Sequence, residues 1–342
     1  MYLCYPIGER VVSMNQTNDE EIIANSIIAL NSISWKIRVQ AAEDLISFGT
    51  SAIMPLMLKV KQGFFNVAAL PEAVRVLGTI GDVQIVDLLI EMLSSNQVHA
   101  AQEAAKGLGR VGDPRAIPAL IDVFRRDWND EETVAMWQEA SRALARIGDT
   151  ALFPLITALQ DQNSAVRSGV IDALSQLKDP RTVDPLLGML QDPDSQVRAD
   201  AISALAQIGD EKVAEPLTTM LKDENWYIRC RVLYALGDLR VSSTIDTIAL
   251  TLHDPEPRVR SAAAIALGKF NNAQPFLIEL LKDSASEVRG AAALALGQIG
   301  DEKAIPALQQ MQQHDTGHWG KNSVRDHAAY AIKSIQEKRA EH

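Results

Sequence analysis

A repeat with a period near 31 residues runs through this chain of 342 residues and limits what it can fold into. Five copies align on an arginine, and an aspartate lies six residues before each arginine. The arginines are spaced by 31, 31, 31 and 29 residues. A period of this length predicts a row of similar units, each of which covers its apolar face only by packing on its neighbours. The arginines are Arg167, Arg198, Arg229, Arg260 and Arg289, and the aspartates are Asp161, Asp192, Asp223, Asp254 and Asp283.

Each repeat is predicted to form two helices, a first helix and a second helix. The first is typified by DPRAIPALIDVF (113–124), where Asp113 is expected to cap the helix and Pro114 to occupy its first position. A second proline column is expected inside this helix and should bend it. The second helix carries small and aliphatic residues at helical spacing and ends at a glycine. Equivalent caps are Asp82, Asp149, Asp179, Asp210 and Asp301; the inner prolines are Pro118, Pro154, Pro185, Pro216 and Pro306.

The same template extends in both directions, so the whole chain is predicted to be one array. Degenerate copies lie at 35–49, 70–82, 101–113, 137–149 and 322–335. The predicted fold is an all-α solenoid of about ten helix pairs wound as a right-handed superhelix. We expect residues 1–19 to form a loosely attached leader and residues 20–338 to form a single elongated domain. The fourth repeat is lengthened around 125–133 and should stack differently.

Composition removes several other classes of protein. Aromatic residues make up only 5% of the chain, which favours helices over a β-sandwich or barrel. A net charge of −11 argues against a protein that coats nucleic acid. No uninterrupted apolar run is long enough to span a membrane. The two cysteines, Cys4 and Cys230, lie far apart in the sequence and suit a reducing, cytoplasmic location.

The pattern resembles the HEAT-like repeats of the phycobilisome-lyase type. The resemblance rests on the Asp-x5-Arg spacing, the ALGxIGD stretch, and the P-L-x-x-x-L of Pro185, Leu186 and Leu190. It implies a hydrogen-bonded ladder between repeats formed by the aspartate and arginine columns, from Asp161 to Arg289. It also implies relatives that include bilin lyases, phycobilisome-degradation proteins and scaffolds. The implied partners are a phycobiliprotein or a second HEAT-like subunit, and a bilin is the implied ligand of the lyases.

In such folds the second helices line the concave surface, where a partner would bind. Counted from the ladder arginine, the outward positions are expected at −3, −2, +1, +2, +5 and +9. Repeats 2 to 4 place a charged stripe there, which would either contact a polar partner or form pairs in solvent between each glutamate and the basic residue three positions on. Arg110 and Arg146 lack such a built-in partner and are the better contact candidates. The stripe consists of Glu72, Glu103, Glu139, Arg75, Lys106 and Arg142.

Repeats 5 to 7 present a different surface. Asp172 and Asp200 add negative charge, and the seventh repeat then places Trp226, Tyr227, Cys230, Arg231 and Tyr234 at outward positions. Tryptophan, tyrosine and arginine are typical of binding hot spots, and they would also hold a flat conjugated ligand. Alternatively, Trp226 and Tyr227 fill a turn between repeats. Cys230 is expected to be a half-buried small residue, because no histidine is placed to activate it.

The C-terminal stretch 314–330 carries three histidines, but Gly317 and Gly320 interrupt any helix that would align them, so no metal site is predicted. Trp319 is expected to seal the end of the array. Because no catalytic set of residues emerges, the predicted function is a non-enzymatic scaffold or assembly factor without a cofactor, which binds a protein partner on the concave face. The alternative is a bilin lyase or lyase-like chaperone that attaches a tetrapyrrole to a phycobiliprotein cysteine or removes it. The histidines are His314, His318 and His327.

Overall fold

A computed structural model describes residues 7–126 and 131–340 of the chain. These residues form helices throughout, apart from one short hairpin near the C-terminus, so the predicted all-α solenoid is confirmed. Within the described ranges no helix is both long and apolar enough to cross a membrane. The fold divides into two compact units, Met1–Leu177 and Lys178–His342.

The first unit contains ten α-helices in its described part, joined by short loops and 3-10 turns. Its α-helices are α1 (Ile7–Leu30), α2 (Trp35–Phe48), α3 (Ile53–Lys61), α4 (Leu70–Ile80), α5 (Val86–Leu93), α6 (Val98–Val111), α7 (Ile117–Asp122), α8 (Glu131–Ile147), α9 (Asp149–Ala158) and α10 (Ser164–Leu177). Its 3-10 segments are η1 (Gly49–Ala52), η2 (Val83–Ile85), η3 (Pro114–Ala116) and η4 (Val123–Arg125).

The second unit repeats the same arrangement with greater regularity. Its α-helices are α11 (Val183–Gly188), α12 (Ser195–Ile208), α13 (Ala214–Thr219), α14 (Trp226–Leu239), α15 (Ile245–Leu250), α16 (Pro257–Leu267), α17 (Gln274–Leu280), α18 (Ser286–Ile299), α19 (Ile305–His314) and α20 (Val324–Ala340). Its 3-10 segments are η5 (Pro180–Thr182), η6 (Met189–Gln191), η7 (Glu211–Val213), η8 (Met220–Lys222), η9 (Ser242–Thr244), η10 (Thr251–His253) and η11 (Glu302–Ala304), and its strands are β1 (His318–Trp319) and β2 (Asn322–Ser323).

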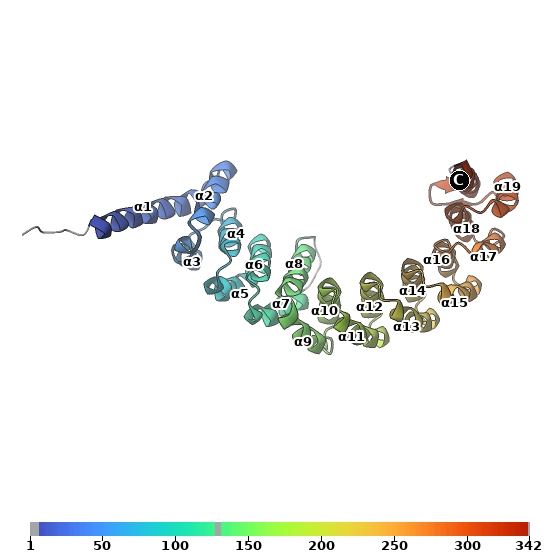
Figure 1. Cartoon of the computed structure of the whole chain (residues 1–342), viewed down its shortest axis with the longest axis horizontal. Helices are drawn as coiled ribbons and strands as arrows, with labels where there is room; N and C mark the ends of the chain where they lie inside the picture. The colour runs from blue at the N-terminus through green and yellow to red at the C-terminus, as the bar shows by residue number, and fades with distance from the viewer. Residues whose placement is uncertain (1–6, 127–130, 341–342) are drawn as a thin grey trace, which may run out of the picture. The chain divides into compact units, whose positions relative to one another are not determined.

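Two parallel rows of helices make up the second unit. The second helices α12, α14, α16, α18 and α20 pack one on the next, and each also packs on the first-helix segment of its own repeat. Figure 1 shows the second helices as one row, on the inner side of this unit's curve, and the first-helix segments as the other. The core lies between the rows and is built from small residues of the second helices, such as Ala263 and Ala292, and leucines of the first, such as Leu217 and Leu277.

The inner prolines do not bend a long first helix as the sequence suggested. In most repeats that helix is instead split into a 3-10 turn followed by a short α-helix, and the proline lies in the first turn of the α-segment. Pro118 is at the start of α7 and Pro306 at the start of α19. In this turn a missing N–H leaves no hydrogen bond unmade, so proline is tolerated there. Pro154 alone among the column lies well inside its helix, α9.

The predicted start and stop signals act at most repeats. Asp113 accepts a hydrogen bond from the backbone N–H of Arg115 at 2.9 Å, and Asp82, Asp179, Asp210 and Asp301 cap their 3-10 turns in the same way. Asp149 is an exception, because Gly148 occupies the N-cap of α9 and no side chain caps that helix. Closing glycines adopt left-handed conformations, as Gly209 does at φ +74°.

Arg240 stands where other repeats have the closing glycine. It ends α14 in the left-handed region at φ 54°, which costs a residue with a Cβ about 1–2 kcal/mol. We therefore expect Arg240→Gly to raise the free energy of unfolding by about 1 kcal/mol, part of the gain being offset by glycine's greater freedom in the unfolded chain. Urea denaturation followed by circular dichroism measures this change. Arg258→Gly, which replaces an arginine inside a right-handed helix, should lower stability instead.

One end of the described chain departs from the sequence expectation, and the other agrees with it. Helix α1 runs without a break from Ile7 to Leu30, across the boundary at residue 19 that the sequence suggested for a leader. At the other end, β1 and β2 form an antiparallel hairpin that places Trp319 over α18, where a Cβ on Gly290 would lie 2.7 Å from the indole. Trp319 also lies 5.3 Å from the ring of His327. Trp319 therefore covers part of α18 beside the last helix, in keeping with its predicted sealing role.

Candidate interaction surface

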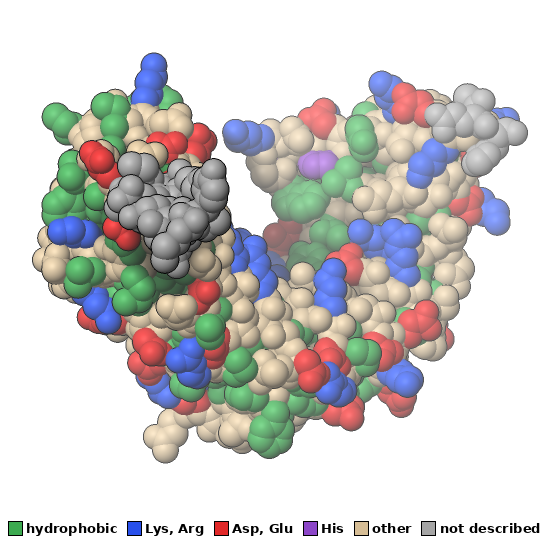
Figure 2. All heavy atoms as spheres, turned by 60° about the vertical axis from the view of Figure 1, so that its left-hand side comes forward, with side chains coloured by type: hydrophobic (Ala, Val, Ile, Leu, Met, Phe, Trp, Pro, Cys, Tyr) green, Lys and Arg blue, Asp and Glu red, His purple; other side chains and the backbone are tan. Residues whose placement is uncertain are grey.

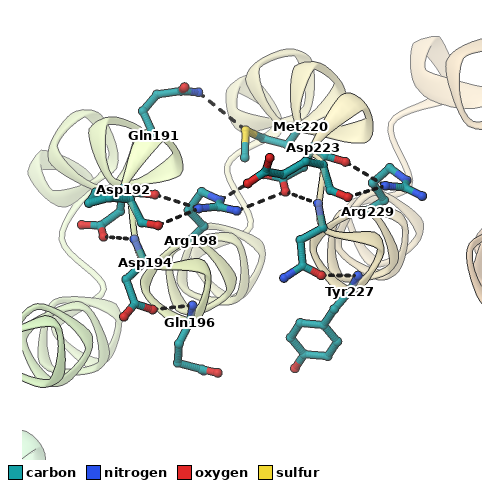
Figure 3. Close-up of polar contacts among 12 residues, drawn as sticks. Gln191, Asp192, Asp194, Gln196, Arg198, Met220, Asp223, Tyr227 and Arg229 are labelled. Atoms are coloured by element: carbon teal, nitrogen blue, oxygen red, sulfur yellow. Dashed lines mark hydrogen bonds and ion pairs between the residues drawn. The ribbon is translucent and has the colours of Figure 1, made fainter.

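A ladder of arginines and aspartates fixes the second helices of the second unit in one register (Figure 3). Arg229 places Nε and Nη2 on the two carboxylate oxygens of Asp254, in the next repeat, at 2.8 and 2.9 Å. Its Nη1 donates to the backbone carbonyl of Asp223, six residues earlier, at 2.8 Å. The implied ladder is thus present here. The same bonds join Arg198 to Asp223, Arg260 to Asp283 and Arg289 to Asp315.

In two of the ladder pairs, the arginine lowers the pKa of its carboxylate partner. Hydrogen bonds from Arg289 hold the pKa of Asp315 below its ordinary value, although partial burial opposes this. For Asp283, burial raises the pKa, yet hydrogen bonds from Arg260 and a backbone N–H outweigh it, so the net shift is downward. Asp315 comes from the histidine-containing C-terminal stretch, so the ladder continues into a repeat whose sequence is degenerate.

In the first unit the ladder is replaced by other contacts. Arg125, at the end of the fourth repeat's first helix, forms a bidentate pair with Asp161 at 3.1 and 2.5 Å. It supplies the positive charge that is missing from this repeat's second helix, where Trp137 stands at the arginine position. The lengthened segment 125–133 lies partly outside the described residues. Arg167, at the last ladder position of this unit, donates Nη1 to the carbonyl of Asp161 at 2.8 Å.

The charged stripe of repeats 2 to 4 consists of pairs within each helix. Arg75 binds Glu72 at 2.6 Å, and the equivalent pairs in the next two repeats, Lys106–Glu103 and Arg142–Glu139, are each 2.7 Å long. Each glutamate thus pairs with the basic residue three positions on, as one of the two interpretations expected. Arg110 and Arg146 lie exposed near the ends of α6 and α8, as expected for contact candidates. Figure 2 shows Lys and Arg scattered among Asp and Glu over the face that it draws.

The two acidic candidates are engaged by neighbouring polar groups. Asp172 accepts hydrogen bonds from the buried hydroxyl of Ser141 at 2.5 Å and from the amide of Gln176 at 2.9 Å. Asp200 accepts one from Gln196 at 2.8 Å. Both residues are half-buried, so their carboxylates offer less area to a partner than exposed side chains would.

Aromatic side chains from the seventh repeat form the most distinctive surface of the second unit. Trp226, Tyr227 and Tyr234 are 37%, 41% and 43% exposed on α14. Trp226 and Tyr227 meet edge to face at 6.1 Å, and the guanidinium of Arg258 lies 4.7 Å from the indole ring. Arg258 was not among the sequence candidates, although it stands at the outward −2 position of the eighth repeat. Trp226, Tyr227, Tyr234 and Arg258 are called the aromatic cluster below.

Two further candidates from the seventh repeat face inward. Cys230 is buried at 6% exposure, so its placement as an outward contact residue was wrong. Burial raises the pKa of its thiol to about 11, which leaves it protonated and unreactive at neutral pH. Arg231 is half-buried and donates to the hydroxyl of Ser203 on α12, so it links two second helices.

The three C-terminal histidines, as the structure describes them, do not form a metal-binding cluster. Throughout residues 7–126 and 131–340, no three His, Cys, Asp or Glu side chains are placed to hold a metal ion. His327 is buried, and its Nδ1 lies 3.0 Å from the backbone carbonyl of Ser323, whereas His314 and His318 are exposed. Of the three histidines, only His327 therefore packs into the end of the array.

A cavity that the sequence did not indicate lies on the first-helix side of the second unit. It has a volume of 540 Å³ and opens between α15 and α17, where Leu250 and Phe276 provide apolar walls and His253 and Lys282 provide polar ones. The repeat pattern of the sequence does not predict this cavity, because it is the space between the first-helix segments of two neighbouring repeats.

The family model for HEAT repeats matches residues 68–138, 133–206, 185–249 and 245–333. No curated protein matches the chain. Among solved structures, Kap121p is similar with a TM-score of 0.63 at 14% identity, over 93% of this chain and 42% of that one. A complex of Kap95p with RanGDP is similar with a TM-score of 0.59 at 14% identity, over 93% of this chain and 50% of that one. The chain thus spans half or less of these proteins, and the likeness is one of fold.

Proposed function

Because the chain belongs to the HEAT-repeat family, we propose that it is a non-enzymatic scaffold or assembly factor, which acts in the cytoplasm and needs no cofactor. The partner is a protein, and it binds on the row of second helices in the second unit. One of the similar structures is the karyopherin Kap121p bound to the SUMO protease Ulp1p, which is an example of this fold holding a protein.

The aromatic cluster is the observation that carries this proposal. It offers three partly exposed aromatic rings of α14 and an arginine of α16 that lies against one of them, and these residue types dominate protein–protein binding energies. The ladder beneath it holds α12, α14 and α16 in fixed register, so the cluster is ordered before any partner arrives. A preorganised surface loses less side-chain entropy on binding.

Replacing Trp226 by alanine should weaken binding of the partner at least roughly tenfold, or about 1.4 kcal/mol. The loss removes the indole that Arg258 covers, and it leaves the fold intact because the side chain is more than a third exposed. The partner is first isolated with the wild-type protein and identified, and its affinity for each variant is then measured by calorimetry.

Leu250→Ala is the matched control for this measurement. Leu250 is 74% exposed in the same unit, but it lies on α15 in the first-helix row. Its loss should leave the affinity unchanged. If Leu250→Ala weakened the complex and Trp226→Ala did not, the partner would bind the first-helix row instead of the second-helix row.

The bilin-lyase alternative, with its phycobiliprotein or HEAT-like partner, remains a prediction from the resemblance. The aromatic cluster favours it to the extent that flat rings and Arg258 suit a conjugated carboxylate ligand. Mixing the protein with phycocyanobilin and recording the visible absorption tests it directly. A shifted and sharpened band that Trp226→Ala removes would support the lyase, and an unchanged band at high protein concentration would count against it.

A further inference from the structure

Arg38, in the first repeat, holds its guanidinium as the ladder arginines do. Its Nη1 donates to the carbonyl oxygens of Ser32 at 2.9 Å and Ile33 at 3.0 Å, which lie six and five residues earlier. Arg289 makes the same two bonds, six and five residues back, at 2.8 and 3.0 Å. The shared contacts orient the remaining Nε–Nη2 edge of Arg38 toward the turn of the next repeat, where each ladder arginine of the second unit finds its carboxylate.

Arg38 finds no carboxylate at that place. The ladder aspartate lies six residues before the arginine column, and in the second repeat this position is Phe64. Within the described ranges, Nε of Arg38 is buried and has no hydrogen-bond partner. A buried charged donor without a partner is costly, so such a group gains more than an ordinary surface arginine from meeting an anion.

Neutral contacts hold the first two repeats together instead of the ladder. The side-chain amide of Asn31 donates to the carbonyl of Phe64 at 2.9 Å, which is the bond that a ladder arginine makes within its own repeat. Its oxygen accepts from the backbone N–H of Asn66 at 2.8 Å, as a ladder aspartate does two residues on. Because Asn31 performs both structural tasks, the stacking of these repeats does not need a carboxylate, and Nε of Arg38 is left without a partner among the described residues.

Two exposed apolar residues, Ile33 and Trp35, precede Arg38 within five residues. Ile33, whose carbonyl Arg38 binds, is fully exposed, and Trp35, one helical turn before Arg38 on the same face, is 63% exposed. An arginine beside an exposed tryptophan and isoleucine combines a charge with contact area, which suits an anion carried on an apolar segment. A strongly hydrated anion such as inorganic phosphate would gain nothing from these neighbours.

We infer that Arg38, together with Ile33 and Trp35, is a docking site for a protein partner that presents an aspartate or glutamate within an apolar segment. The partner's carboxylate occupies the position of the absent ladder aspartate and receives the bidentate bond from Nε and Nη2. This site lies in the first unit and does not depend on the aromatic cluster or on the function proposed above.

The Nε–H resonance of Arg38 in the ¹⁵N-labelled full chain reports on this bond. The probes are an acetylated, amidated tetrapeptide Leu-Asp-Leu-Leu, its counterpart with Asn in place of Asp, and sodium phosphate. We expect the Asp peptide to shift the Arg38 resonance in a saturable way, at least roughly tenfold more tightly than the Asn peptide. The Nε–H resonances of Arg198, Arg229 and Arg260 should not move, because their carboxylates are already in place. Equal binding of both peptides, or tighter binding of phosphate, would overturn the inference.

Two variants separate binding from folding. Arg38→Gln should abolish the peptide response, whereas Arg110→Gln, at an exposed arginine of the same unit, should leave it unchanged. Phe64→Asp restores the ladder carboxylate within the chain, so the Arg38 resonance should move without peptide and the peptide should no longer bind. If Phe64→Asp shifts Arg38 and peptide binding persists at full strength, the peptide occupies another place and the assignment is wrong.

Discussion

Replacing Arg229 by alanine is expected to lower the free energy of unfolding by about 3–5 kcal/mol. The side chain is only 13% exposed and makes two bonds to Asp254 and two to backbone carbonyls. Its removal leaves a mostly buried carboxylate without its cation, and it also removes the donor for the turn that starts α14. Chemical denaturation of the full chain, followed by circular dichroism, measures the loss.

Arg181 provides the matched control for Arg229. It also contacts an aspartate, Asp179, at 2.6 Å, but its side chain is 59% exposed. Solvent screens such a pair, so Arg181→Ala should leave the denaturation midpoint nearly unchanged. Similar losses from both variants would mean that burial of the ladder pair does not matter, which contradicts the structural argument.

Replacing Gly78 by alanine is expected to lower the free energy of unfolding by about 2 kcal/mol, although alanine is the better helix former. Gly78 on α4 faces Gly107 on α6, and a Cβ at Gly78 would lie 2.7 Å from the Cα of Gly107. The neighbour is backbone and cannot rotate away, so the two helices must separate and loosen the core between them.

Gly188→Ala is the opposite case and serves as the control for Gly78. Gly188 ends α11 with a right-handed φ of −59°, and nothing lies within 4 Å of the position of its Cβ. This substitution should raise stability by about 0.5–1 kcal/mol, because it reduces the freedom of the unfolded chain without a clash. If Gly78→Ala were also stabilising, the close approach of α4 and α6 would not be a constraint on the fold.

The repeat period predicted the helices well, because each helix uses local signals that recur with the period. Caps such as Asp113 and stops such as Gly209 are readable within one repeat. The expected effect of the inner prolines was wrong. A column of prolines indicates that a helix is interrupted, but it does not indicate whether the helix bends or starts again after a 3-10 turn. Both outcomes satisfy the same local chemistry.

The candidate surface was only partly predictable. Register along one helix placed Trp226, Tyr227 and Tyr234 outward, and the structure agrees. The same rule failed at Cys230, which it placed outward although the side chain is buried. The contact of Arg258 with Trp226 joins two repeats, and sequence spacing within one repeat does not report it.

The sequence by itself determined that the chain is a row of helix pairs, because this is a property of a short segment repeated many times, and the resemblance to HEAT-like repeats added the expectation of a ladder between them. Only the tertiary structure decided which charges find partners. Asp161 pairs with Arg125 instead of a column arginine, and Arg38 has the ladder geometry without its aspartate. The reason is physical: an ion pair depends on where two repeats bring their atoms, and a change of one residue in either repeat breaks it without disturbing the local pattern that each helix needs to form.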